Sequence, residues 1–200
     1  MNLMQDALAA SGYRVANVDY PSRHQPIEQL AAPSVEVGVE RCALRAGERV
    51  HFVTHSMGGI LVRYYLAHHA IPALGRVVML APPNGGSEVV DNLEEFPGFE
   101  LLNGPAGLQL GTGPEHLPEQ LGAVDYPVGI IAGTRSVNPV LSQFLPNPDD
   151  GKVSLQRTKV EGMTDFIAVE ASHPFIMRDQ EAIAQTIAFL QSGRFIHDSP

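Results

Sequence analysis

Short apolar runs alternate with helical patterns along most of this 200-residue chain. Several of the runs are apolar throughout, which is typical of strands that are buried on both faces. Helices that alternate with such strands indicate a parallel sheet with helices on its two sides, so the sequence predicts a three-layer α/β fold of about five or six mostly parallel strands, in one domain over residues 1–200. The expected strands are YRVANVDYP, RVHFVTH, LGRVVMLAPP, PVGIIAGTR and DFIAVEAS.

Helical patterns fill most of the sequence between these strands. NLMQDALAA places its apolar residues on one helical face and is followed by Gly12, a common helix stop. A second helix is expected over residues 27–44, interrupted near Pro33 because proline removes a backbone donor. The chain closes with DQEAIAQTIAFLQSG, an amphipathic helix that we expect to end at Gly193.

Charge and cysteine content exclude several classes of protein. The net charge is −9 and no stretch is rich in lysine or arginine, so we expect no nucleic-acid partner. No stretch is apolar enough for stable membrane insertion and the N-terminus lacks the features of a signal peptide, which predicts a cytoplasmic location. Cys42 is the only cysteine, which rules out a disulfide within the chain. We expect no metal site and no cofactor, since His68 and His69 face different sides of a helix.

The sequence VTHSMGG places Ser56 between an apolar strand and a helix. A sharp turn of this kind exposes a serine hydroxyl and requires small residues nearby, as Gly58 provides. Thr54 stands where glycine is usual. The first helical N–H, that of Met57, is positioned to hold an oxyanion. We interpret Ser56 as a nucleophile; the alternative is a serine that only caps the helix.

A nucleophilic serine needs a base and an acid, which in this arrangement follow it along the chain. His173 comes directly after a predicted strand and is the expected base, whereas His116 lies in a loop and His197 in the C-terminal tail. The expected acid is Asp150 in NPDDGKV, with Asp149 as the alternative. We interpret His55 as a structural neighbour that points away from Ser56.

Residues 86–122 break the alternation of strands and helices. The segment is rich in glycine and its apolar residues follow no clear period. We expect an irregular loop or lid-like insertion, in which Phe96, Phe99 and Leu101 bind substrate at the border of an acyl pocket. The alternative is a surface excursion that packs only on itself.

These motifs resemble the α/β-hydrolase family and its lipase- and esterase-like members. VTHSMGG is similar to their nucleophile elbow, DDGKV to the segment with their acid, EASHPF to the segment with their histidine, and GYRVANVDYPSR to an early strand. The resemblance implies a serine hydrolase that cleaves a small-molecule ester or lipid through an acyl-serine intermediate. It leaves open an acyltransferase with the same residues, a weak or inactive binding protein, and the oligomeric state.

The resemblance also implies a first strand and an His-Gly loop ahead of NLMQDALAA. That loop gives the second oxyanion N–H in the family. Because this sequence begins on the helix, we expect a fold without the first strand and an impaired activity.

Overall fold

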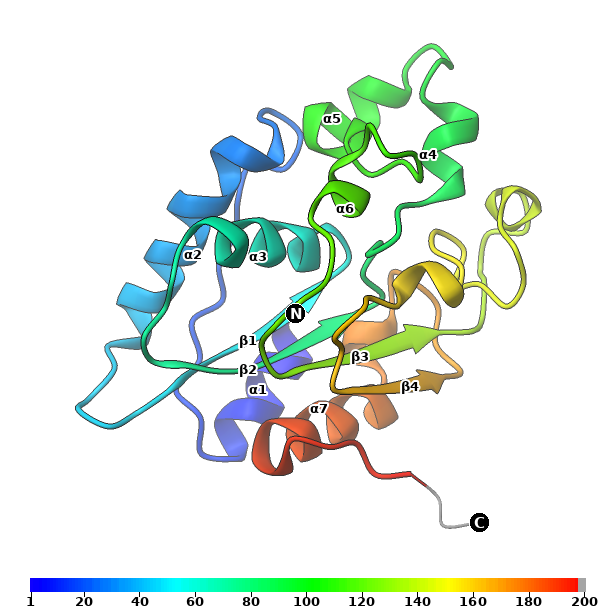
Figure 1. The fold of residues 1–200 in the computed structure, drawn as a ribbon. Helices are drawn as coiled ribbons and strands as arrows, with labels where there is room; N and C mark the ends of the chain where they lie inside the picture. Colours follow the sequence, from blue (N-terminus) through cyan, green and yellow to red (C-terminus); the bar gives the residue numbers. More distant parts are fainter. Residues whose placement is uncertain (198–200) are drawn as a thin grey trace.

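The computed structural model describes residues 1–197, apart from the side chain of Leu102. Within them four strands form one parallel sheet in the order β1-β2-β3-β4 (Figure 1). The three-layer α/β architecture with a parallel sheet is as predicted, but the described residues form four strands and not five or six. The strands are β1 (Val50–His55), β2 (Leu74–Leu80), β3 (Val128–Gly133) and β4 (Asp165–Val169).

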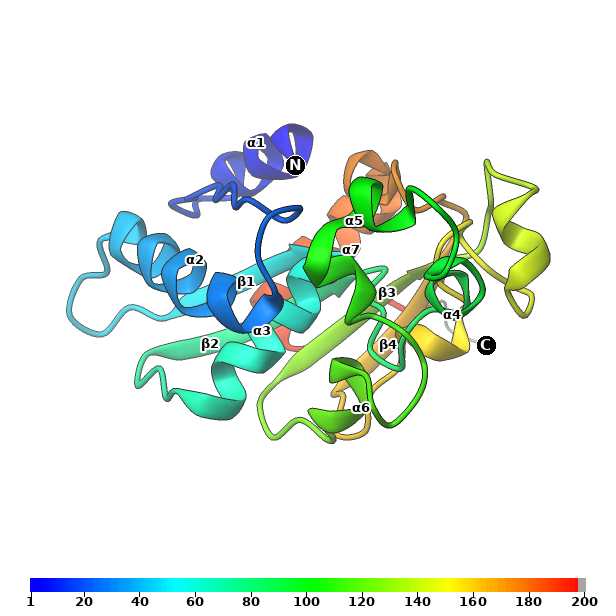
Figure 2. The ribbon, with the colours of Figure 1, turned by 90° about the horizontal axis from the view of Figure 1, so that it is seen from above.

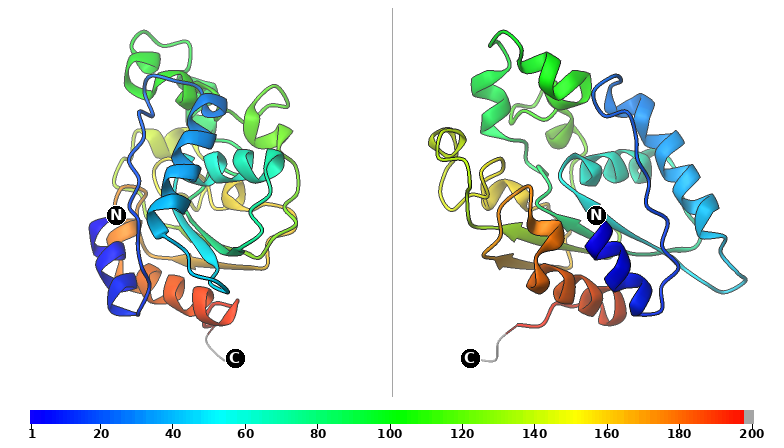
Figure 3. Two further views of the ribbon diagram at one scale, coloured as in Figure 1. Left: turned by 90° about the vertical axis from the view of Figure 1, so that its left-hand side faces the viewer. Right: turned by 180° about the vertical axis from the view of Figure 1, so that it is seen from behind.

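Residues 13–20, predicted as a strand, are extended but do not join the sheet. Figure 3 shows this segment, in blue, running from the first helix toward the second. Its side chains alternate as they do in strands, yet the backbone N–H groups of residues 14–20 donate no hydrogen bond to another part of the described chain. The prediction of a paired strand is therefore wrong, because a strand requires a partner and none lies beside this segment.

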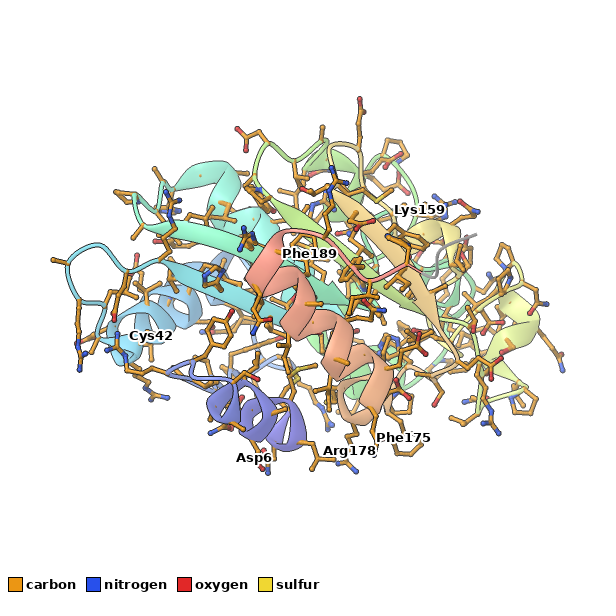
Figure 4. The ribbon with its side chains drawn as sticks, turned by 90° about the horizontal axis from the view of Figure 1, so that it is seen from below. Asp6, Cys42, Lys159, Phe175, Arg178 and Phe189 are labelled. Carbon is orange, nitrogen blue, oxygen red and sulfur yellow. The ribbon has the colours of Figure 1, made fainter. Side chains whose placement is uncertain are left out.

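Helices cover both faces of the sheet. Seen from below, α1 (Asn2–Ala10) and α7 (Gln180–Ser192) cover one face together (Figure 4). Phe189 of α7 is fully buried against Gly129 of β3, where a side chain on the glycine would collide with the ring. On the other face α2 (Ile27–Cys42) and α3 (Met57–His68) pack against each other and against the strands (Figure 2).

Helix α2 continues through Pro33, contrary to the predicted interruption. Proline removes a single backbone donor, and the buried residues on both sides of it keep the helix docked in the core. The helix ends at Cys42, where Ala43 takes a left-handed conformation with φ of 45°. The predicted end near residue 44 was therefore close to the observed one.

Residues 86–122 are more regular than the sequence indicated. They contain three short helices, α4 (Glu88–Leu93), α5 (Phe99–Leu108) and α6 (Leu117–Gln120). Gly104 has φ of 68° and ψ of 179°, a conformation confined to glycine, and a side chain there would meet the backbone of Arg23 at 2.4 Å. The Gln109 side chain accepts the N–H of Ile27 at 2.7 Å, which caps α2. The segment is thus docked on the body of the domain.

A buried arginine also holds this segment. Arg63 of α3 is 3% exposed, and its guanidinium donates to the carbonyl oxygens of Asn84, Pro118 and Gly122. Burial lowers the pKa of Arg63 from its ordinary value, while carbonyl acceptors compensate the cation. Three 3-10 helices complete the described elements, at Leu141–Phe144, Gln156–Thr158 and Ile176–Arg178. None of the helices described here has the length and apolar character that a membrane span requires.

Candidate active site

Ser56 lies at the carboxyl end of β1, directly before α3. Its φ is 53° and its ψ is −129°, which is a strained conformation for a residue with a side chain. The turn is crowded: a side chain at Gly59 would lie 3.1 Å from Pro82, and one at Gly58 would lie 3.4 Å from the hydroxyl of Tyr20. Because Met57 is the first residue of α3, its N–H has no acceptor within the helix.

The structure brings His173 to Ser56. His173 lies on the loop between β4 and the 3-10 helix Ile176–Arg178, 117 residues away in sequence. Its Nε2 atom is 2.8 Å from Ser56 Oγ, and the residue is 7% exposed. The two side chains are therefore within hydrogen-bond reach across the carboxyl edge of the sheet.

Asp150 lies on the other side of the same imidazole. Its Oδ2 atom is 2.8 Å from His173 Nδ1, and its own backbone carbonyl accepts the N–H of His173 at 2.9 Å. The second carboxylate oxygen, Oδ1, accepts the backbone N–H groups of Lys152 and Val153. Asp150 is fully buried. With Nδ1–H donating to the carboxylate, Nε2 of His173 is left free to accept the hydroxyl proton of Ser56.

The residues considered as alternative acids and bases do not belong to this hydrogen-bonded group. Asp149 Oδ1 accepts the N–H of Gly151 and the hydroxyl of Ser142, which makes its carboxylate part of a loop turn. His116 lies near Glu115, and His197 near Asp165. The structure brings Ser56, His173 and Asp150 together and leaves these others apart.

His55 contacts His173 and does not point away from the site. Its Nε2–H donates to the carbonyl oxygen of His173 at 2.9 Å, and the two ring centroids are 4.9 Å apart. Burial, and secondly the charge of His173, lower the pKa of His55 to about 4, so its ring is neutral near pH 7. The sequence offered one signal of this contact, the position of a histidine directly before Ser56.

The depressed pKa of His55 predicts a loss of stability in acid. The unfolded chain binds this proton near pH 6.5 and the folded chain only near pH 4, so the free energy of unfolding falls as the pH is lowered between these values. We expect His55→Gln, whose amide can still donate to the carbonyl, to remove up to about 3 kcal/mol of that pH dependence. Urea titrations at pH 7 and pH 4.5 measure it.

The matched control is His68→Gln, because His68 is exposed at the end of α3 and bonds only to the carbonyl of Tyr64. This variant should keep the wild-type dependence on pH. An equal effect of the two substitutions would show that the acid sensitivity has another origin. His173, Asp150 and Lys152, which also face His55, are the same in both variants.

A small cavity adjoins Ser56. Its volume is about 30 Å³, and it is bordered by residues of α4 and α5, including Val90 and Phe99, and by Lys152. Burial lowers the pKa of Lys152, and the nearby Asp150 acts in the opposite sense. The sequence reasoning did not identify Lys152, because nothing in NPDDGKV signals which way its side chain points.

The three residues predicted to border the acyl pocket are placed differently from one another. Phe99 lines the cavity beside Ser56. Phe96 and Leu101 are 62% and 82% exposed and do not line it. Phe96 lies in the connection between α4 and α5, whereas Phe99 and Leu101 lie on α5. The sequence predicted a pocket role for all three because a segment without a clear period does not show which apolar residues face inward.

Comparison with known proteins finds similar structures but no similar sequences. No protein-family model matches the chain, and no curated protein matches it in sequence. Among solved structures, the mature lipase BlEst2 of Bacillus licheniformis superposes with a TM-score of 0.71 at 19% identity, over 96% of this chain and 84% of that one. A metagenomic carboxyl esterase gives 0.65 at 18% identity, over 86% of this chain and 58% of that one.

The phospholipase PlaB of Legionella pneumophila gives a TM-score of 0.58 at 21% identity, over 78% of this chain and 40% of that one. The chain thus spans less than two thirds of the phospholipase and of the metagenomic esterase. Such likenesses establish the arrangement of strands and helices. The chain has the α/β-hydrolase fold, in the form found in these lipases and esterases.

Proposed function

We propose that this protein is a serine hydrolase that cleaves carboxylic esters through an acyl-serine intermediate. The observation that carries the proposal is the continuous chain of hydrogen bonds from Ser56 Oγ through His173 to buried Asp150, with both distances at 2.8 Å. A serine that only capped a helix would not need positive φ or a histidine partner. The neighbours in structure are named a lipase, a carboxyl esterase and a phospholipase, which supports the same reaction class.

In the proposed reaction Ser56 Oγ attacks the ester carbonyl carbon while His173 Nε2 takes the hydroxyl proton. The carbonyl π electrons move to oxygen and give a tetrahedral oxyanion. Collapse of this intermediate breaks the bond to the alcohol oxygen, which takes the proton from His173 and leaves. Water then attacks the acyl-serine by the same steps, and the acid and Ser56 are released. Asp150 keeps the imidazole oriented and stabilises its charged form.

The oxyanion is held in this proposal by the N–H of Met57. This group is the first donor of α3, a helix of 12 residues, and the positive end of the helix dipole adds to its effect. The crowded turn around Gly58 and Gly59 keeps the helix close behind the reacting carbon. Ground-state esters lack the negative charge, so this interaction favours the transition state.

The cavity beside Ser56 indicates the acyl group. A water molecule needs roughly 10–15 Å³ of the same measure, so a volume of about 30 Å³ has room for only about two to three groups of that size. Its walls from α4 and α5 are largely apolar. We infer a preference for esters of short aliphatic acids over esters of long ones.

A fluorophosphonate probe tests the nucleophile and a short ester tests the reaction. We expect the probe to label the intact protein at one site, on the tryptic peptide that contains Ser56, and p-nitrophenyl butyrate to be hydrolysed at a rate that labelling abolishes. Labelling of a different peptide would overturn the proposal, as would ester turnover that survives complete labelling. Addition of an alcohol acceptor separates hydrolysis from acyl transfer, since a transferase forms the new ester in preference to the free acid.

Phe99→Ala should enlarge the acyl cavity and shift the chain-length preference. Phe99 borders the cavity, so we expect kcat/KM for the octanoate relative to the butyrate ester to rise by roughly 10-fold. Phe96→Ala is the matched control, since Phe96 belongs to the same segment but is exposed. A ratio that stays at the wild-type value in Phe99→Ala, with only the melting temperature lowered, would assign Phe99 to packing alone.

A further inference from the structure

The backbone of His173 is held at both of its polar groups, by bonds from two different parts of the chain. Its N–H donates to the carbonyl oxygen of Asp150 at 2.9 Å. Its carbonyl oxygen accepts the Nε2–H of His55 at 2.9 Å, and no backbone N–H of the described residues donates to this oxygen. Pro174 follows, so the next peptide unit has no N–H that could anchor the loop. The bond from His55 is therefore the one that fixes the carbonyl side of His173.

His55 belongs to the same anchored segment of backbone as the nucleophile. It is the last residue of β1, directly before Ser56, and it pairs in register with Leu80 of β2. Leu80 is fully buried, and its carbonyl oxygen accepts the N–H of Ser56 at 2.9 Å. A bond from His55 to His173 therefore sets the position of the base relative to the nucleophile, and not only relative to its own loop.

The reacting atoms tolerate little displacement. His173 Nε2 must stay within hydrogen-bond reach of Ser56 Oγ, now 2.8 Å away, while Nδ1 keeps its bond to Asp150. The side chain of histidine is short, so a shift of the backbone at residue 173 moves Nε2 by a similar distance. A misplacement of about 1 Å can lower the rate of a reaction by about 100-fold. An anchor on the backbone of the base thus bears directly on the proton transfer.

The ring of His55 is suited to be a donor and not a second base. Burial, and secondly the charge of His173, lower the pKa of His55 to about 4, so the ring is neutral near pH 7. A neutral imidazole carries one N–H, and the bond to the carbonyl of His173 places it on Nε2. The neutral ring also leaves His173 as the only positive charge of the pair once it has taken the proton of Ser56.

We propose that His55 is a positioning residue of the ester hydrolysis, because its Nε2–H holds the carbonyl of His173 and keeps the imidazole where it takes the proton of Ser56. This inference rests on the proposed function and adds to it a residue that does not touch the substrate. His55 is not among the described residues that border the cavity beside Ser56. Loss of the bond should therefore slow the chemical step and leave the binding of the ester nearly unchanged.

Two substitutions separate the hydrogen bond from the packing of the ring. His55→Phe keeps an aromatic ring beside His173 and removes the donor, whereas His55→Gln removes the ring and keeps an amide N–H of similar reach. His51→Phe is the matched control, since His51 lies on the same strand, where its Nδ1 accepts the N–H of Arg76 at 2.9 Å. Steady-state kinetics on p-nitrophenyl butyrate, the rate of fluorophosphonate labelling and thermal melting are measured for each variant and the wild type.

We expect His55→Phe to lower kcat and the maximal rate of labelling by about 10- to 100-fold, with KM within about 3-fold of the wild type. His55→Gln should keep kcat within about 3-fold, because the bond to the carbonyl is retained. His51→Phe also leaves a backbone group without its partner, so its melting temperature should fall. Its kcat should stay within about 2-fold of the wild type, since His51 lies at the far end of β1 from Ser56.

Equal kcat values in His55→Phe and the wild type overturn the inference and leave the proposed function intact. An equal loss in His55→Phe and His55→Gln assigns the effect to the ring, and an equal loss in His51→Phe assigns it to stability; each of these results overturns the inference as well. A wild type that is neither labelled nor active overturns the proposed function, and this inference with it.

His55→Asn serves if His55→Phe does not fold. Its amide is the same group as in His55→Gln but is one methylene shorter, so it does not reach the carbonyl of His173. We expect kcat to fall by about 10-fold or more in His55→Asn and not in His55→Gln, with KM similar in both. Equal kcat values in these two variants overturn the inference.

Discussion

Ser56→Ala should abolish ester hydrolysis while the protein stays folded. The substitution removes the only hydroxyl within hydrogen-bond distance of His173 in the described residues, so no acyl-enzyme can form. In serine hydrolases of full activity such a loss reaches about 10⁶-fold in kcat. The melting temperature should change little, because no side-chain cap is lost and alanine meets the same positive φ as serine. Hydrolysis of p-nitrophenyl butyrate measures the loss.

Ser136→Ala is the control for this experiment. Ser136 lies on the loop after β3, where its hydroxyl exchanges hydrogen bonds with the backbone of Asn138 and has no histidine partner. We expect its activity to remain within about 2-fold of the wild type, in the usual range for a surface substitution. Retention of full activity in a clean preparation of Ser56→Ala would remove the basis of the proposed function.

The sequence identified the strands that have a partner within this chain. β2 and β3 are short runs that are buried almost throughout, and this burial leaves a clear record in their composition, whereas β1 and β4 are only partly buried. Residues 13–20 have the same local pattern but are unpaired, because pairing depends on what lies alongside and not on the residues themselves. The helix interruption predicted at Pro33 was wrong for a similar reason, since the packing of α2 on the core outweighs the loss of one backbone N–H donor.

The residues of the candidate site could be predicted where a sequence motif and the order of the residues along the chain indicate the same residue. Ser56 stands at a strand end before two glycines, and His173 follows the last strand, so parallel strands bring both to one edge. The direction of a side chain on a loop is harder to predict. His55 donates a hydrogen bond to the carbonyl of a residue 118 positions later, and Phe99 faces the cavity while Phe96 and Leu101 of the same segment are exposed.

Asp150→Asn should lower kcat by about 10⁴-fold through the orientation and tautomer of His173. Asparagine has the shape of aspartate but only one carboxamide oxygen. If that oxygen stays with the N–H groups of Lys152 and Val153, the amide nitrogen faces His173 Nδ1 and donates to it. The imidazole then carries its proton on Nε2, toward Ser56, and cannot act as a base.

The other orientation of the amide turns its NH₂ group toward the two backbone donors and leaves them unsatisfied in a buried place. Both orientations are unfavourable, which is why a change of one atom is expected to have so large an effect.

Asp149→Asn is the matched control: its oxygen can still accept the N–H of Gly151 and the hydroxyl of Ser142, so kcat should stay within about 10-fold of the wild type. Steady-state kinetics on p-nitrophenyl butyrate, with circular dichroism to verify folding, distinguish the two variants. If Asp149→Asn is the crippled variant and Asp150→Asn the mild one, the acid is the neighbouring residue, and the hydrogen bonds of Asp150 serve only to hold the loop.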